Sequence, residues 1–102
     1  MGYNARNDEI RDNMILKKLT SSQIRAARAL LRWSAEDLAR DSAVGITTIR
    51  RAELAEAETS LTAANDRAIK HALENAGVEF IDENGGGPGV RLRKRQRAKK
   101  QK

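Results

Sequence analysis

Only four residues connect two short segments that have the composition of helices, and this connection limits the possible folds more than any other part of the sequence. The first segment is AEDLARD (35–41), and the second begins at Ile46 with ITTIRRAELAEAE. So short a connection keeps the two helices in direct contact. Three apolar residues are spaced so that they would lock the helices together: Leu38, Val44 and Ile49. The pattern predicts a helix-turn-helix unit.

Helices are also predicted on both sides of this unit. Residues 8–19 have a partial apolar face, and residues 22–32 and 63–76 repeat apolar side chains at helical spacing. The expected core positions of the two stronger helices are Ile24, Ala27, Leu30, Leu31, Ile69, Ala72, Leu73 and Ala76. Hydroxyl side chains stand where they can cap helix starts: at 20–22, at Ser34 with Asp37 as its capping-box partner, and at Thr62.

The pattern changes from helical to strand-like after Gly77, a residue that suits the end of a helix. VEFI (78–81) and VRLR (90–93) alternate apolar and polar residues on either side of a Gly-rich loop, which predicts a β-hairpin. We therefore expect an all-α fold with a short C-terminal hairpin. Its parts are an N-terminal segment (1–19), a helix-turn-helix domain (20–77), the hairpin (78–93) and a disordered basic tail (94–102).

The composition argues against several kinds of functional site. The chain of 102 residues has no cysteine, which rules out disulfides and thiolate metal sites, and its one histidine, His71, falls on a polar helix face. The glycine-rich run 85–89 lacks the Lys-Ser/Thr and the following helix of a phosphate-binding loop. No apolar run approaches the length of a membrane span. We expect no enzymatic activity, no metal or cofactor, and a cytoplasmic location.

Positive charge is concentrated at the C-terminal end. The net charge is +6, yet residues 1–89 carry 12 Lys/Arg and 14 Asp/Glu, whereas residues 90–102 carry eight basic residues and no acid. A basic block of this kind attracts polyanions. It can bind phosphates, or it can serve only as a solubilising or localising tail. Phosphate binding is the better interpretation only if the rest of the chain also suits nucleic acid.

The helix-turn-helix stretch resembles the Cro/C1-type (XRE) family of phage and bacterial regulators. The resemblance covers about residues 20–76, where RAARALLRW followed by SAEDLAR is a good match. The end of the domain, ALENAGVEFIDENGGGPGVRLRK, is similar to a compact bacterial subgroup of that family. The resemblance implies a lambda-repressor-like bundle of about five helices that binds operator DNA, usually as a dimer.

On this resemblance, the helix over about 46–54 is the recognition helix, which enters the major groove of DNA. The base-reading positions of the family match Ile46, Thr47, Arg50 and Arg51. Arginine can pair with guanine, and threonine can contact bases or phosphates. Phosphate contacts are expected from Ser34, Thr48, Arg91, Arg93, Lys94, Arg95 and Arg97.

Some positions depart from the family pattern. Ala35 stands where many members have a phosphate-binding Gln, and Gly45 replaces the usual Ser or Thr cap of the recognition helix. Ala43 stands where the turn usually has glycine in a left-handed conformation, which costs alanine about 1 kcal/mol. Leu54-Ala55 replaces a common Arg/Asn-Gly stop, so the recognition helix is expected to run a turn longer, towards Glu56 and Glu58.

The sequence thus predicts a transcriptional regulator, with repression the favoured action, that binds double-stranded DNA as a homodimer. Three alternatives remain open at this point, one of them a helical module that interacts only with proteins. The chain could be an antitoxin that also binds a toxin protein through residues 1–19 and 78–102. It could also be a non-specific nucleic-acid binder that acts through its basic tail.

Overall fold

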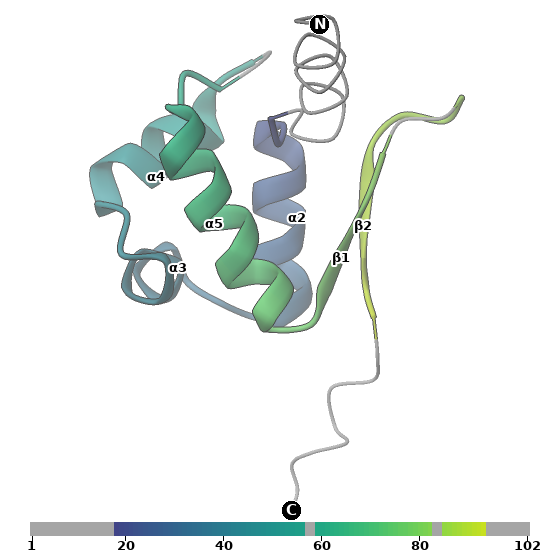
Figure 1. Cartoon of the computed structure of the whole chain (residues 1–102), viewed down its shortest axis with the longest axis horizontal. Coiled ribbons are helices and arrows are strands. Elements are labelled where there is room, and N and C mark those ends of the chain that lie inside the picture. Colours follow the sequence, from purple (N-terminus) through teal and green to yellow (C-terminus); the bar gives the residue numbers. More distant parts are fainter. Residues whose placement is uncertain (1–17, 57–58, 83–84, 94–102) are drawn as a thin grey trace, which may run out of the picture.

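A computed structural model describes residues 18–56, 59–82 and 85–93 as four helices followed by a two-stranded antiparallel hairpin (Figure 1). The helices are α2 (Ser21–Leu31), α3 (Ala35–Ser42), α4 (Ile46–Leu54) and α5 (Ala63–Asn75), and the strands are β1 (Val78–Ile81) and β2 (Gly89–Leu92). The helix expected over 8–19 lies outside the described residues, except for Lys18 and Leu19, which are not helical.

Side-chain caps begin three of the helices, as the sequence predicts. Thr20 and Gln23 form a capping box at the start of α2, and Ser34 and Asp37 form another at the start of α3. Thr62 caps α5 by accepting a hydrogen bond from the Asn65 backbone N–H at 3.0 Å. Each cap supplies a partner to a backbone N–H that the helix leaves free, so these starts are fixed by residues within a few positions of one another.

The turn between α3 and α4 is held in a left-handed conformation by its own residues. Ala43 has φ 63°, the conformation expected at this position. The Ser42 hydroxyl donates to the Leu38 carbonyl at 2.7 Å and accepts from the Val44 N–H at 3.2 Å. Ser42 is buried, so water does not compete for these bonds, and they fix the end of α3 and the start of the following turn. The predicted pair of short helices with a tight connection is confirmed.

The core lies where the helices and the hairpin meet. Its largest fully buried side chains are Ile24, Leu38, Ile49, Ile69, Leu73 and Val78. The three predicted anchors of the turn are therefore buried, since Val44 is buried as well. Trp33 packs against this core from the end of α2. Leu30 was expected in the core, but its side of α2 faces outward and the residue is 39% exposed.

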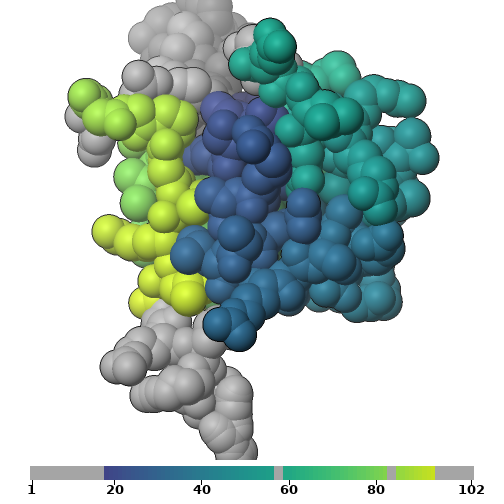
Figure 2. Space-filling model, turned by 180° about the vertical axis from the view of Figure 1, so that it is seen from behind, coloured from purple at the N-terminus to yellow at the C-terminus, as the bar shows by residue number. Residues whose placement is uncertain are grey.

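The hairpin covers one side of the helices. In the register Val78↔Leu92 and Phe80↔Val90, the apolar side chains share the face that packs on the helices. The predicted hairpin is confirmed, with β2 starting one residue earlier than expected. Seen from behind, α2 lies between β2 and the region of α3 and α4 (Figure 2). The Gln23 amide donates to the Gly89 carbonyl at 3.2 Å, which ties β2 to α2.

The chain just before α2 is attached to α5 by a buried carboxylate. The Leu19 backbone N–H donates to Asp66 Oδ1 at 3.0 Å, and both residues are buried. Burial raises the pKa of the Asp66 carboxyl, while the hydrogen bond from Leu19 opposes that shift.

In the described part of the chain, no helix is long and apolar enough to cross a membrane.

Candidate nucleic-acid interface

The recognition-helix candidate α4 has one buried and one exposed side. Ile49 and Ala52 face the core, whereas Thr47, Arg50 and Arg51 are exposed. These three predicted base-reading residues therefore share the surface of one helix. Ile46, the fourth, is only partly exposed because it packs against the core, so its expected outward position is wrong in part.

The extension of α4 by a further turn is wrong. The helix ends at Leu54, and Ala55 takes an extended conformation (φ −65°, ψ 141°). The reason lies in α2, where the Ser21 hydroxyl donates to the Ala55 carbonyl at 2.7 Å. That carbonyl is thereby tied to the start of α2 instead of continuing a helix. Glu56 follows outside the helix, and Glu58 lies outside the described residues.

A bidentate ion pair fixes α4 against α2. Arg28 Nε and Nη2 lie 2.7 Å from the two carboxylate oxygens of Glu53, and Arg28 Nη1 donates to the Trp33 carbonyl at 2.8 Å. The Arg28 and Glu53 side chains are 23% and 9% exposed. The bond to Glu53 raises the pKa of Arg28, so the guanidinium stays charged. Three N–H donors of one side chain thus join α2, α4 and the chain leading to α3.

Arg50 forms an ion pair across the two short helices. Its Nη2 lies 2.7 Å from Glu36 Oε2, on the first turn of α3, and the two side chains are 58% and 63% exposed. Sequence reasoning missed this pair because 14 residues separate its members. Acidic residues in the first turn of α3 were visible, but the angle between the helices was needed to bring Glu36 to Arg50.

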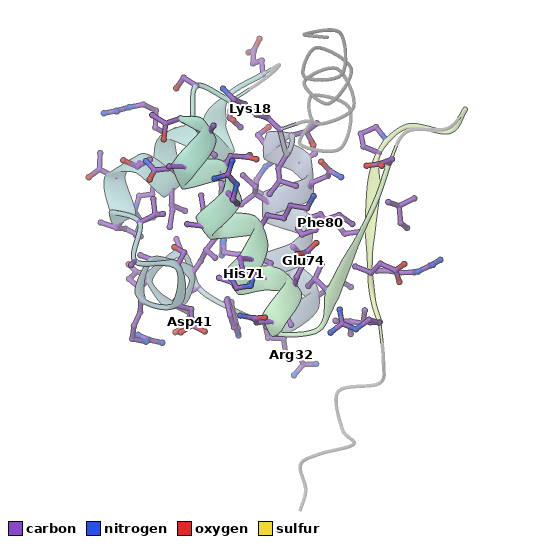
Figure 3. The ribbon with its side chains drawn as sticks, in the orientation of Figure 1. Lys18, Arg32, Asp41, His71, Glu74 and Phe80 are labelled. Atoms are coloured by element: carbon purple, nitrogen blue, oxygen red, sulfur yellow. The ribbon has the colours of Figure 1, made fainter. Side chains whose placement is uncertain are left out.

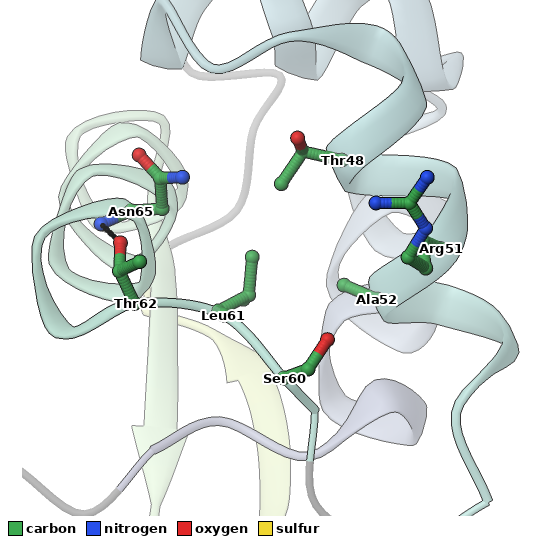
Figure 4. A pocket seen from close by; sticks show the side chains of 7 residues that line it. All are labelled: Thr48, Arg51, Ala52, Ser60, Leu61, Thr62 and Asn65. Atoms are coloured by element: carbon green, nitrogen blue, oxygen red, sulfur yellow. Dashed lines mark hydrogen bonds between the residues drawn. The ribbon is translucent and has the colours of Figure 1, made fainter.

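Arg51 borders a hollow of about 180 Å³ beside α4 (Figure 4). Its lining combines one cation with hydroxyl and amide groups from α4, the following loop and the start of α5: Thr48, Arg51, Ala52, Ser60, Leu61, Thr62 and Asn65. The N-terminal end of α5 adds the positive end of its helix dipole. The predicted phosphate contact Thr48 therefore lines the same hollow as Arg51, among groups that can donate hydrogen bonds.

The other predicted phosphate contacts divide between the two ends of the molecule. The exposed Ser34 at the start of α3 uses its oxygen as the cap acceptor, and its hydroxyl also interacts with the Asp37 carboxylate. The Ser34 N–H and Arg40 both bond to Asp37 and lower the pKa of that carboxyl.

Arg91 and Arg93 lie on the hairpin, which α2 and α5 separate from α4 (Figure 1). Arg91 is paired with Glu79, which it holds at a lowered pKa, and Arg93 donates to the Glu74 carbonyl. These two arginines are therefore not brought together with the exposed residues of α4. Lys94, Arg95 and Arg97 lie outside the described residues.

No known family model matches the chain, and no curated protein matches it either.

Within residues 18–56, 59–82 and 85–93, no group of three His, Asp or Glu side chains could hold a metal ion. His71, on α5, is exposed (Figure 3). The candidate site is thus a surface of hydroxyl and guanidinium groups, whose chemistry suits binding.

Proposed function

We propose that this protein is a sequence-specific, double-stranded-DNA-binding transcriptional regulator with a lambda-repressor-like fold of the Cro/C1 (XRE) type. The observation that supports this most is the pair α3–α4. Its tight turn and buried anchors fix α4 while Thr47, Arg50 and Arg51 stay exposed on it. A helix held in this way can enter the major groove and present hydroxyl and guanidinium groups to base edges.

Phosphate contacts on both sides of α4 would set its position in the groove. On one side, the exposed Ser34 hydroxyl at the start of α3 would exchange its contact with Asp37 for a phosphate. On the other side, the hollow beside Arg51 offers donors from α4 and the start of α5. Contacts of this kind orient the protein without reading sequence. The basic run 90–102 adds sequence-independent affinity through the release of counterions.

A homodimer would complete the recognition. One helix as short as α4 reads only a few base pairs, so two copies on a two-fold related site are needed for useful selectivity. The half-sites would lie about one helical turn of DNA apart. No cofactor enters this proposal, and no catalytic step is assigned to the chain.

The test is binding of the purified full chain to the DNA upstream of its own gene, against scrambled DNA of equal length and over a salt series. The variant Arg50→Ala/Arg51→Ala removes two exposed cations of α4. The matched control Arg25→Ala/Arg32→Ala removes two exposed cations, one on α2 and one at its C-cap. A third form ends at Arg93, because β2 extends to Leu92 and a shorter chain would lose part of the strand.

The proposal predicts a preference of about a thousandfold or more for the native site. The α4 variant should lose that preference and the α2 control should keep it. The form that ends at Arg93 should bind both DNAs less tightly and with a weaker salt dependence. If instead both DNAs bind alike and only the tail matters, the protein is a non-specific nucleic-acid binder and the proposal is wrong.

A further inference from the structure

One ion pair joins the first helix of the α3–α4 unit to an exposed arginine of the second. Glu36 Oε2 accepts from Arg50 Nη2 at 2.7 Å, and the pair is the contact that the structure gives for the Arg50 side chain. Both side chains are more than half exposed, so the pair adds little to the stability of the fold. Its effect must be sought in what Arg50 binds.

The geometry leaves Arg50 able to read a base while Glu36 holds it. A guanidinium has five N–H donors, arranged so that two adjacent ones can bond O6 and N7 of guanine. Glu36 accepts from a single nitrogen, Nη2, which leaves one such adjacent pair available. The long side chain of Arg50 is thus oriented before DNA arrives, and less conformational freedom is lost on binding.

Glu36 also places a negative charge at the surface that would face DNA. That charge repels phosphates of every sequence alike, and it competes with them for Arg50. The donors that Glu36 leaves available can bond a guanine while the Glu36–Arg50 pair stays intact, whereas a phosphate at the same donors is repelled by the carboxylate. The carboxylate therefore weakens non-specific binding more than specific binding.

We propose that Glu36 is a positioning residue that makes Arg50 selective for guanine at one base pair of the operator. This inference rests on the proposed function and adds to it a residue from α3. The family positions named above for base reading lie on α4, and Glu36 acts through one of them without touching the base itself.

The experiment measures the affinities of the full chain for its native site, for a panel with each base pair replaced in turn, and for scrambled DNA. Glu36→Gln removes the charge with little change in shape, and each variant is checked by its helical circular dichroism. Asp41→Asn is the matched control, because Asp41 is also an exposed carboxylate of α3. Both substitutions are repeated in an Arg50→Ala background.

Glu36→Gln should reduce the preference for native over scrambled DNA about tenfold, within the range that one bidentate arginine–guanine contact supplies. The loss should be concentrated at a single G·C pair. Asp41→Asn should raise the affinity for all DNAs alike. With Arg50 already replaced, Glu36→Gln should leave the preference unchanged.

Two results would overturn the inference while the proposed function stands: a preference that Glu36→Gln leaves intact, or an equal loss with and without Arg50. A wild-type chain without any preference for its native DNA would reject the proposed function and this inference together. The wild-type measurement thus separates the two failures.

Discussion

Replacing Glu53 by glutamine should destabilise the fold strongly, although it alters few atoms. The Glu53 carboxylate is 9% exposed and accepts two bonds of 2.7 Å from Arg28. Glutamine keeps the shape and one acceptor oxygen, but its NH2 group points a donor at an N–H of Arg28. The Arg28 guanidinium, which is 23% exposed, then keeps its bond to the Trp33 carbonyl but only one of its two acceptors at position 53.

The expected loss follows from that burial. Removing one member of a buried ion pair lowers the free energy of unfolding by roughly 3–5 kcal/mol, whereas a solvent-exposed ion pair contributes about 0–1 kcal/mol. Because Arg28 keeps some access to solvent, we expect a loss of about 2–3 kcal/mol in the free energy of unfolding. For a domain of this size that corresponds to a fall in Tm of roughly 10–20 °C. Glu36→Gln, at the exposed pair, should cost less than about 1 kcal/mol.

Urea unfolding, monitored by circular dichroism, measures the free energy of unfolding of both variants. The slope of each transition is checked for two-state behaviour. A further variant, Arg28→Met/Glu53→Leu, removes both charges. It should be more stable than Glu53→Gln, since a buried ion pair can be replaced by apolar groups at little cost. Similar losses for Glu53→Gln and Glu36→Gln, or a double variant weaker than Glu53→Gln, would refute the argument from a stranded charge.

Two further predictions concern stability. Ala43→Gly should stabilise the fold by about 0.5–1 kcal/mol, because the left-handed conformation at φ 63° is strained for alanine and the gain exceeds the added freedom of the unfolded chain; a lower midpoint in urea would contradict this. Asp66→Asn should raise stability at neutral pH, because burial raises the pKa of Asp66 in the folded state and its charged form is disfavoured there. This advantage should shrink as the pH falls through the folded pKa of Asp66 towards 3.8, the ordinary value, because the folded wild type then takes up its proton. An advantage that stays constant from pH 7 to pH 3 would show that the burial of Asp66 has no such effect.

The features that local sequence predicts are those decided within a few residues. Thr20, Ser34 and Thr62 were recognisable as caps because each bonds a backbone N–H three positions along the chain. The hairpin follows from similarly local preferences, whereas the left-handed turn at Ala43 was expected from the family resemblance, because alanine itself disfavours that conformation. Sequence therefore predicts the helix starts, the connection between α3 and α4, and the three residues exposed on α4.

The features that sequence reasoning missed depend on distant contacts. The end of α4 is set by Ser21, 34 positions away from Ala55, and no local signal at Leu54 reveals it. Arg28 and Glu53 are 25 positions apart and appear in the sequence as ordinary charged residues of two helices. The rotation of a helix about its axis also depends on what it packs against, which is why Leu30 faces outward.

The central place of α2 determines how a change at the hairpin would be felt elsewhere. The hairpin packs on α2 and α5, and α4 packs on α2 and α3. On α2, Gln23 holds the Gly89 carbonyl and Arg28 holds Glu53, so about one turn and a half of one rigid helix separates the two attachments. A load on β2 that shifts α2 along its axis is carried to α4 by the bidentate pair. The hairpin and α4 are therefore mechanically coupled along α2, with α5, which packs on both β1 and α3, as a second connection, and loosening either attachment on α2 would weaken the coupling.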